Sequence, residues 1–323
     1  MAEVTVVVPT HNRRALLLRT LHSVLAQRDV DVAVVVVDDG GSDGTPEAIH
    51  DLNDHRVTVV RHNRPRGVSA ARNSGIAQAV TPWLAFVDDD DLWAPDKLRS
   101  QLDALASDAS AGWSCTGSVN IDQQCNVSWW AEPPQGSDVG NLLLQGNEIP
   151  GGGSGVVASR DLALAVGGFD ESLSNLADWD FYIRLGLRSP LAAVSQPLLG
   201  YYVHPQGMSY NVRRGALEYR LVEQKYGPVR AQRGVTLDRR AWLHYLSGQA
   251  YRSGDRLAAT RLSVELIGRY RHWRTVPTCA FWLAPEAVRQ LRPGRQEREI
   301  PLPPGWADKA KRWLAPYAFG WPD

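Results

Sequence analysis

Four consecutive aspartates, at residues 88–91, follow the apolar run WLAFV (83–87) and precede Leu92 and Trp93. Two like charges about 4 Å apart repel by about 1 kcal/mol in water and by about 4 kcal/mol at an effective dielectric constant of 20. A half-buried cluster of this kind is unfavourable unless a cation compensates it. Carboxylate oxygens suit Mg²⁺ or Mn²⁺, which keep water ligands and also take phosphate oxygens. The cluster therefore predicts a site for a metal and a diphosphate. The alternative is that one aspartate caps the next helix and the others are solvated.

Two other polar loops also follow apolar, β-branched runs. VTVVV (4–8) leads into PTHNR, and VAVVVV (32–37) leads into DDGGSDG, while VTVV (57–60) is a third run of the same type. Such runs are typical of strands buried on both faces of a parallel sheet, and the segments between them have helical periodicity. We expect an α/β fold with a doubly wound, mostly parallel sheet and helices on both faces. Ligands bind beyond the carboxyl ends of such strands, so the three loops should share one edge.

The pattern changes after about residue 110. Shorter strand-like pieces (WSCTGSVNI, VSWW and LLGYYVH), a glycine run at 151–155 and a predicted helix at 178–187 precede a mostly helical region that includes a helix-turn-helix hairpin at 242–268. We predict an α/β domain at 1–212, with halves 1–110 and 111–212, followed by a mainly helical C-terminal extension at 213–323.

Composition excludes several function classes. Of 323 residues, 44% are hydrophobic and 22% charged, as in globular proteins, and 35 basic residues balance 35 acidic ones. We therefore expect no nucleic-acid binding through a global charge. Cys115, Cys125 and Cys279 form no C-x-x-C pair, which favours small buried side chains. The absence of a signal-like or membrane-spanning apolar run predicts a cytoplasmic protein. The tail KAKRWLAPYAFGWPD mixes basic and aromatic residues, so it suits either peripheral membrane contact or packing on the body of the protein.

Five segments, in this order, resemble those of the family 2 glycosyltransferases of the GT-A fold. They are VVVPTHNRRALLLRTLHSVLAQ, VVVVDDGGSDGT, GVSAARNSGIAQA, FVDDDDLWAPDKL and GGFDESLSNLADWDFYIRL, and they span about residues 3–210. The resemblance implies a nucleotide-binding first half and an acceptor-binding second half. It also implies transfer of a sugar from a nucleoside diphosphate sugar, usually with inversion at the anomeric carbon.

The resemblance also implies a set of nucleotide-binding residues. The first loop would lie against the base and ribose, and Asp39 would accept a hydrogen bond from N3–H of uracil or thymine, which favours a UDP- or dTDP-sugar over a CDP-sugar. Arg72 would lie near the base and phosphate, although by itself it could be a surface arginine. The full set is Pro9, Thr10, His11, Arg13, Asp39, Gly67, Arg72, Asp88 and Asp89.

The acidic motif and one histidine are the metal candidates that the resemblance implies. Asp88 would contact ribose or metal, Asp90 would bind Mn²⁺ or Mg²⁺, and Asp91 would support Asp90, while Asp89 fills the variable place between them. His204 matches a family histidine that ligates the metal or touches the phosphate. A divalent ion there would neutralise the charge on the departing nucleoside diphosphate.

Asp178 is the candidate general base, because inverting transfer to a hydroxyl needs a carboxylate that takes its proton. It matches the second residue of the family's Glu-Asp pair, but the preceding Glu is Ala177 here. Asp180 is the competing base. Gly152 and Gly153 would let the acceptor approach the backbone, and Trp179 would either stack on a sugar or belong to the core.

Together these observations predict a metal-dependent, inverting glycosyltransferase that uses a UDP- or dTDP-sugar. The acceptor would be a hydroxyl of a glycan, a lipid-linked glycan or a natural product, and homo-oligomer formation is left open. The alternative is a catalytically inactive nucleotide-sugar-binding or scaffold protein on the same fold. A nucleotidyltransferase is disfavoured because PTHNRR is not a glycine-rich phosphate loop.

Overall fold

The computed structural model of the chain describes residues 2–136, 138–204, 207–271 and 302–318. It divides into two compact units. The first comprises residues 1–143, 148–203 and 301–323, and the second comprises residues 144–147 and 204–300. The division therefore falls earlier than the predicted boundary at residue 212, and residues 302–318 join the α/β unit rather than the helical region.

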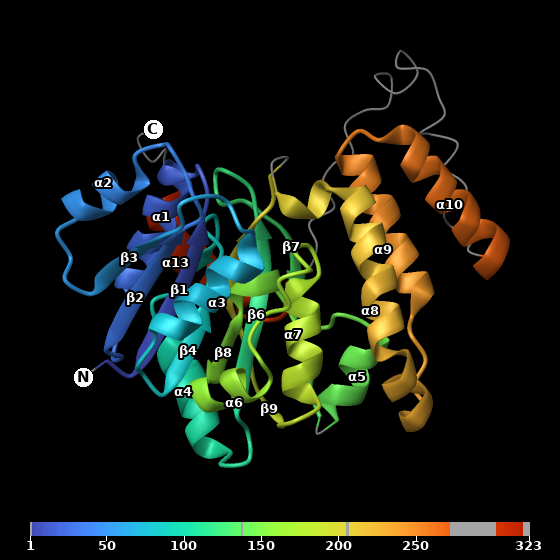
Figure 1. Cartoon of the computed structure of the whole chain (residues 1–323), viewed down its shortest axis with the longest axis horizontal. Coiled ribbons are helices and arrows are strands. Elements are labelled where there is room, and N and C mark those ends of the chain that lie inside the picture. The colour runs from blue at the N-terminus through green and yellow to red at the C-terminus, as the bar shows by residue number, and fades with distance from the viewer. Residues whose placement is uncertain (1, 137, 205–206, 272–301, 319–323) are drawn as a thin grey trace. The chain divides into compact units, whose positions relative to one another are not determined.

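One nine-stranded sheet forms the centre of the first unit (Figure 1). Its strands are β1 (Val4–Thr10), β2 (Val32–Asp38), β3 (Val57–Arg61), β4 (Trp83–Phe86), β5 (Leu92–Trp93), β6 (Trp113–Ile121), β7 (Val127–Ala131), β8 (Val156–Ser159) and β9 (Leu191–Tyr202). The order is β3-β2-β1-β4-β8-β6-β9-β5, and β7 pairs with β6. The first four strands are parallel, as predicted, whereas β8 is antiparallel to both of its neighbours. The α/β fold class is confirmed.

Helices pack on both faces of the parallel strands. Those of the first unit are α1 (Arg14–Leu25), α2 (Thr45–Asp51), α3 (Val68–Gln78), α4 (Lys97–Ser107), α6 (Arg160–Ala165) and α7 (Ala177–Gly186), while α5 (Val139–Gln145) spans the division. Alternate residues of β1 serve opposite faces: Val6 shares a core cluster with Leu17 of α1. Val7 faces α3, where a Cβ on Gly75 would lie 2.3 Å from Val7 Cγ1. A larger residue than glycine at position 75 would therefore push α3 off the sheet.

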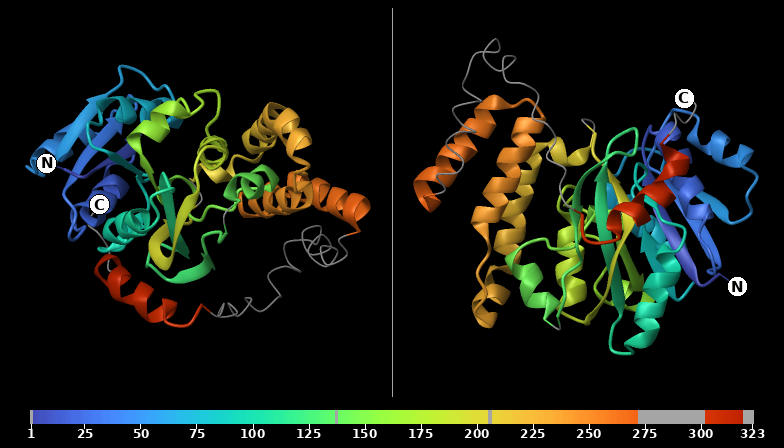
Figure 2. Two further views of the ribbon diagram at one scale, coloured as in Figure 1. Left: turned by 90° about the horizontal axis from the view of Figure 1, so that it is seen from below. Right: turned by 180° about the vertical axis from the view of Figure 1, so that it is seen from behind.

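The C-terminal helix α13 (Trp306–Leu314) packs on β5 and β6, and the view from behind in Figure 2 shows it lying across the sheet. Its apolar side joins one core cluster with the sheet, whose buried members are Leu92, Val119, Ile121, Cys125, Trp306, Ala310, Leu314 and Tyr317. Trp306 fills the space over Gly117, where a Cβ would lie 2.5 Å from Trp306 Cη2. The indole of Trp313 donates a hydrogen bond of 3.1 Å to the Pro197 carbonyl. Of the two uses considered for this tail, packing on the body is the one observed.

Some predicted features lie outside the described residues. Cys115 and Cys125 are buried free thiols, as expected, but Cys279 lies outside that part of the chain, as do Phe319 and Trp321 of the tail. Among the helices that the structure describes, none combines the length and the apolar character needed to cross a bilayer.

The second unit is helical. It contains α8 (Val212–Arg233), α9 (Arg239–Arg252) and α10 (Arg256–Tyr270), and the last two form the predicted hairpin. Asp238 and Asp255 cap them by accepting hydrogen bonds from the backbone N–H groups of Ala241 and Ala258. Gly254 takes the left-handed conformation (φ +78°) that the turn between them requires.

Replacing the indole that covers Gly117 should destabilise the α/β unit. Trp306 is 6% exposed, so Trp306→Ala would leave a cavity beside β6 and lower the free energy of unfolding of this unit by about 3–5 kcal/mol. Scanning calorimetry of the wild type and the variant measures this as a lower unfolding temperature. Lys311→Ala, at an exposed position of the same helix, is the control and should change the unfolding temperature little. An unaltered transition in Trp306→Ala would contradict the packing described for α13.

Candidate active site

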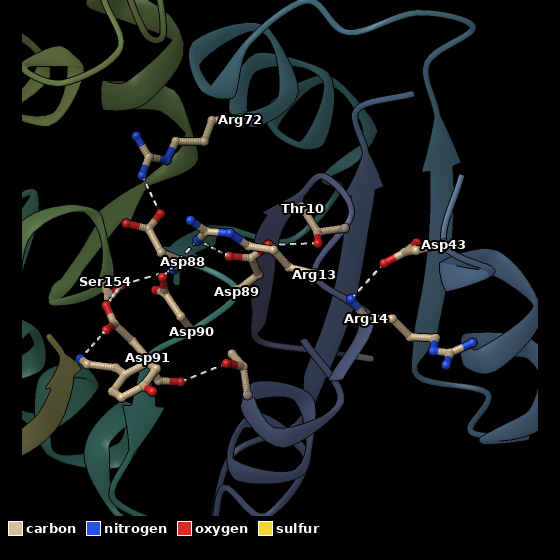
Figure 3. Close-up of polar contacts among 12 residues, drawn as sticks. Thr10, Arg13, Arg14, Asp43, Arg72, Asp88, Asp89, Asp90, Asp91 and Ser154 are labelled. Atoms are coloured by element: carbon tan, nitrogen blue, oxygen red, sulfur yellow. Dashed lines mark hydrogen bonds and ion pairs between the residues drawn. The ribbon is translucent and has the colours of Figure 1, made fainter. Parts of the chain in front are cut away.

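The three predicted loops meet at one edge of the sheet. Parallel pairing aligns Thr10 with Asp38 at the ends of β1 and β2, and Val7 with Phe86 on β1 and β4. The chain after β4 therefore enters the aspartate motif beside the loop that follows β1 (Figure 3). Strand order, which brings β4 next to β1, is what joins these two distant segments.

Each aspartate of the motif has different partners, shown in Figure 3. Asp88 pairs with Arg72. Asp89 accepts hydrogen bonds from Thr10 Oγ1 (2.7 Å) and Arg13 Nη1 (3.1 Å). Asp90 accepts one from Arg13 Nη1 at 2.8 Å. Asp89, expected at a variable place, is buried and held by the first loop, and the separate roles expected of the four aspartates stay predictions.

Asp91 is fully buried and faces away from the two arginines. It accepts hydrogen bonds from Ser154 Oγ at 2.5 Å and from the backbone N–H of Tyr202 at 2.8 Å. Ser154 also accepts a hydrogen bond from the backbone N–H of Asp88 at 2.9 Å, and its carbonyl accepts one from Trp93 Nε1 at 3.0 Å. Ser154 therefore fixes the glycine run at 151–155 to both ends of the acidic motif.

The electrostatics of the motif follow from this crowding. Burial, reinforced by the charge of Asp90, raises the pKa of Asp89 to about 7, even though Arg13 and Thr10 oppose the shift. Burial also raises the pKa of Asp91 well above its usual value, with smaller contributions from Asp90 and Asp88. Burial disfavours the charged form of Arg13, but attraction to Asp89 and Asp90 outweighs it and raises the pKa of that guanidinium. Burial and mutual repulsion thus oppose the ionisation of Asp89 and Asp91.

The residues present fit a divalent cation that is held together with a diphosphate. Three carboxylates face two guanidinium groups, which would leave one negative charge uncompensated if all three were ionised. Their oxygens are the hard ligands that Mg²⁺ and Mn²⁺ take. Among the described residues, no three or more His, Cys, Asp or Glu side chains are arranged as a complete metal site. A set of one or two carboxylates agrees with ions that complete their coordination with substrate phosphates and water.

The nucleotide-base side of the site is built around Asp39. Its Oδ1 lies 2.7 Å from His62 Nδ1 and accepts a hydrogen bond from the backbone N–H of Arg66, while its Oδ2 accepts one from the N–H of Gly67. Nε2 of His62 lies 2.9 Å from Ser74 Oγ. Gly67, with φ of +95°, is the residue from which α3 starts. Asp39 is thus locked in orientation by neighbours on both sides.

The first loop completes this side. Pro9 and Thr10 end β1 as buried residues, and His11 Nδ1 lies 2.8 Å from the Asp39 carbonyl. Arg13 stands before α1 and reaches the aspartates, as described above. All nine residues expected at the nucleotide therefore lie along the same edge of the sheet, and their contact with a nucleotide stays a prediction.

Asp178 lies in the first turn of α7 and is half-buried. Its Oδ1 accepts a hydrogen bond from the backbone N–H of Trp179 at 2.8 Å. Burial raises the pKa of Asp178 to about 6, and the positive charge of Arg72 opposes the shift. Asp178 can therefore be ionised at neutral pH and still accept a proton readily.

The glycine run lies between Asp178 and the aspartate motif. A Cβ on Gly152 would lie 3.7 Å from Asp178 Oδ2, and one on Gly153 would lie 2.2 Å from Arg72 Nη2 and 3.1 Å from Asp88 Oδ1. The Gly152 carbonyl accepts a hydrogen bond of 2.7 Å from Tyr182 Oη. A side chain at 153 would collide with Arg72, and one at 152 would contact Asp178, so glycine at these positions lets the backbone lie close to both.

Two alternatives for α7 are resolved by burial. Asp180 is fully buried and pairs with Arg184 at 2.6 Å, so it is a structural ion pair rather than a competing base. Trp179 is 1% exposed, and its indole N–H donates a hydrogen bond of 2.8 Å to the Leu143 carbonyl. The expectation that Trp179 binds acceptor is wrong for this reason: the ring has no exposed face, and it serves the core.

Sequence reasoning did not anticipate His62 or Ser154, which position Asp39 and Asp91. A signal existed for His62, because it directly follows the third strand and so stands at the same sheet edge. For Ser154 the only signal in the sequence was its position within the glycine run. His204 is a buried residue of the second unit, and its predicted role at the metal stays a prediction.

Solved structures of known proteins share this architecture. Staphylococcus aureus TarS (residues 1–349), solved with UDP-GlcNAc, matches with a TM-score of 0.54 over 89% of this chain and 92% of that chain, at 16% identity. The mannosyltransferase PcManGT from Pyrobaculum calidifontis, solved with GDP-Man and Mn²⁺, matches with a TM-score of 0.53 over 90% and 87%, at 21% identity. At these identities the likeness concerns the fold. The α/β unit therefore has the GT-A fold that these solved glycosyltransferases share.

Sequence comparison relates part of the chain to a known family. The family profile described as Glycosyl transferase family 2 matches residues 5–161, so this part of the chain is similar to that family. The succinoglycan biosynthesis protein ExoO of Rhizobium meliloti is 42% identical over 101 residues, which are 31% of this chain and 29% of that protein. The chain spans between 29% and 61% of the length of the first curated relatives that it matches.

Removing the hydroxyl of Ser154 should lower the stability of the protein. In Ser154→Ala the buried Asp91 carboxyl and the N–H of Asp88 each lose a hydrogen bond, which should lower the free energy of unfolding by about 1–3 kcal/mol. Urea denaturation measures the change, with Ser128→Ala at an exposed position of β7 as the control. Equal stabilities of Ser154→Ala and the wild type would show that the hydroxyl does not brace the motif.

Proposed function

We propose that the protein is a metal-dependent, inverting glycosyltransferase that moves a sugar from a nucleoside diphosphate sugar to a hydroxyl group. The observation that carries the proposal is the arrangement around the glycine run. Asp178 lies beside Gly152, and the Arg72–Asp88 pair lies beside Gly153. A general base on one side and charges suited to a diphosphate on the other are what a single displacement at an anomeric carbon needs.

The proposed donor is a UDP- or dTDP-sugar. Asp39 Oδ2 accepts one hydrogen bond, from Gly67, and a carboxylate oxygen can accept a second. That second position suits an N3–H donor, which uracil and thymine carry and neutral cytosine lacks. The solved relatives named above bind UDP-GlcNAc and GDP-Man respectively, so a nucleotide-sugar donor is well supported and the choice of base rests on Asp39.

In the proposed reaction, Asp178 takes the proton of the acceptor hydroxyl as its oxygen attacks the anomeric carbon. The bond from that carbon to the diphosphate oxygen breaks, and the nucleoside diphosphate leaves from the opposite face. Arg13 and Arg72 offer positive charge to the departing phosphates. A divalent ion held by Asp88 and Asp90 would neutralise further charge on them when bound.

The proposed acceptor is a hydroxyl of a sugar in a growing glycan. Support comes from the relative ExoO, whose name places it in succinoglycan biosynthesis. Support also comes from Gly152, which places no side chain between Asp178 and an approaching hydroxyl.

The base assignment is tested with Asp178→Asn. Loss of the proton acceptor should lower transfer, or donor hydrolysis without an acceptor, by about 10²–10⁴-fold, while the Kd for UDP in the presence of Mn²⁺ stays within about twofold. Release of UDP from a panel of UDP- and dTDP-sugars provides the assay. Because the base must be ionised, wild-type kcat/KM should fall as the pH drops through about 6, and the residual activity of the variant should lack this dependence.

Asp180→Asn cannot serve as the control, since its ion pair is buried, so the exposed Asp51→Asn is used. Retained activity in Asp178→Asn would refute the base assignment. If the wild type bound donor but turned over none of the panel with any acceptor, the alternative of an inactive nucleotide-sugar-binding protein would replace the proposal.

The metal assignment is tested with Asp90→Ala. Substitution of a residue that only hydrogen-bonds a metal ligand commonly weakens metal binding by about 10–100-fold, so removing a ligand should weaken the Mn²⁺-dependent binding of UDP by at least about tenfold. Calorimetric titration of UDP with and without Mn²⁺ measures the effect, and binding of UDP without metal should change less. A Mn²⁺ titration that matches the wild type would exclude Asp90 as a ligand.

A further inference from the structure

Three side chains from three strands form a row on one face of the sheet. In the register, Asn120 of β6 lies opposite Trp129 of β7 on one side and beside Tyr201 of β9 on the other. Paired residues on neighbouring strands project to the same face of a sheet. Trp129, Asn120 and Tyr201 therefore stand next to one another, in that order, across the strands.

The face they occupy is the one that carries the site. Their neighbours Val119 and Trp130 pack with α13, and a Cβ on Gly200 would lie 3.1 Å from Trp313, so that helix covers the alternate residues. Side chains alternate along a strand, which puts Trp129, Asn120 and Tyr201 on the face away from α13. Leu199, on this second face, meets the glycine run, because a Cβ on Gly151 would lie 2.0 Å from its Cδ2.

The row begins at the candidate base. A Cβ on Gly152 would lie 3.7 Å from Tyr201 Cε2 and 3.7 Å from Asp178 Oδ2, so the tyrosine ring and the carboxylate flank the same glycine. From Tyr201 the row runs outward over two strand spacings to Trp129, a distance of about 10 Å. A row of this length can contact more than one ring of a sugar chain.

The chemistry of the row suits a carbohydrate. Trp129 is 56% exposed to solvent, whereas most large apolar residues of this unit are buried. An indole or phenol ring packs on the apolar C–H face of a sugar, and the amide of Asn120 can donate to and accept from hydroxyl groups. A single exposed tryptophan is ordinary by itself. Its alignment with an amide, a second aromatic ring and the candidate base is what points to a ligand.

We propose that Trp129, Asn120 and Tyr201 form an acceptor subsite that binds sugar residues of an oligosaccharide beyond the one that reacts. This proposal rests on the proposed glycosyl transfer, because Asp178 as the base places the reacting sugar at the Tyr201 end of the row. Tyr201 contacts the sugar nearest the base, and Trp129 stacks on a more distant ring. The protein therefore favours an extended glycan over a single sugar as its acceptor, and Trp129 supplies the stacking contact first expected of Trp179.

The test compares trisaccharides with monosaccharides in the presence of UDP and Mn²⁺. Cellotriose, chitotriose and α-mannotriose, each with its monosaccharide, are titrated into the full chain and observed by saturation-transfer NMR. At least one trisaccharide should bind the wild type more tightly than its monosaccharide. Trp129→Ala should weaken that trisaccharide by about tenfold, which corresponds to about 1.4 kcal/mol, and leave the monosaccharide unchanged. Trp129→Phe, which keeps a stacking ring, should recover most of the affinity.

Two controls separate this proposal from the proposed function. Tyr251→Ala removes an exposed aromatic ring of the second unit and should not change trisaccharide binding. The Kd for UDP and the rate of donor hydrolysis should be the same in Trp129→Ala and the wild type. If no trisaccharide binds the wild type, or if Trp129→Ala binds it with unchanged affinity, the subsite is wrong even where donor hydrolysis persists. Absence of any donor turnover in the wild type would instead count against the proposed function.

Discussion

Burial of neighbouring carboxylates after β4 is the constraint on which the rest of the site depends. Asp89 and Asp91 are almost inaccessible to water, so each needs donors supplied by other parts of the chain. Arg13 and Thr10 come from the first loop, Ser154 from the glycine run and the Tyr202 N–H from β9. The requirement to satisfy this one motif therefore draws together segments that are far apart in the sequence.

The same requirement links the donor and acceptor sides of the site. Arg72 forms an ion pair with Asp88. Its positive charge also opposes the rise in the pKa of Asp178. Ser154 joins the motif to the glycine run, which in turn borders the candidate base. A metal diphosphate that entered this arrangement would compete with the aspartates for both arginines. We expect the charges to re-pair on binding, so that donor occupancy influences the base through Arg72.

Sequence reasoning recovered the parts of this structure that depend on local pattern. The parallel strands, the shared edge and the acidic motif follow from β-branched runs and the polar loops after them, and the helical hairpin follows from periodicity. The contacts that depend on register could not be predicted in this way. Whether Trp179 or Trp129 shows a face to solvent is decided by the direction of one helix turn and by one strand pairing. Likewise, Asp180 becomes an ion pair only because Arg184 follows one turn later and is held by α6 and its loop.

The return of α13 to the sheet has a consequence for how the protein is made. Residues 306–317 complete the apolar cluster around Val119 and Ile121, yet residues 204–300 of the helical unit are synthesised before them. The helical unit is thus an insertion within the α/β unit in the order of the chain. During translation one side of β6 stays uncovered until the inserted residues and α13 have left the ribosome. A nonsense mutation between β9 and α13 would therefore damage the domain that carries the site, and not merely its helical neighbour.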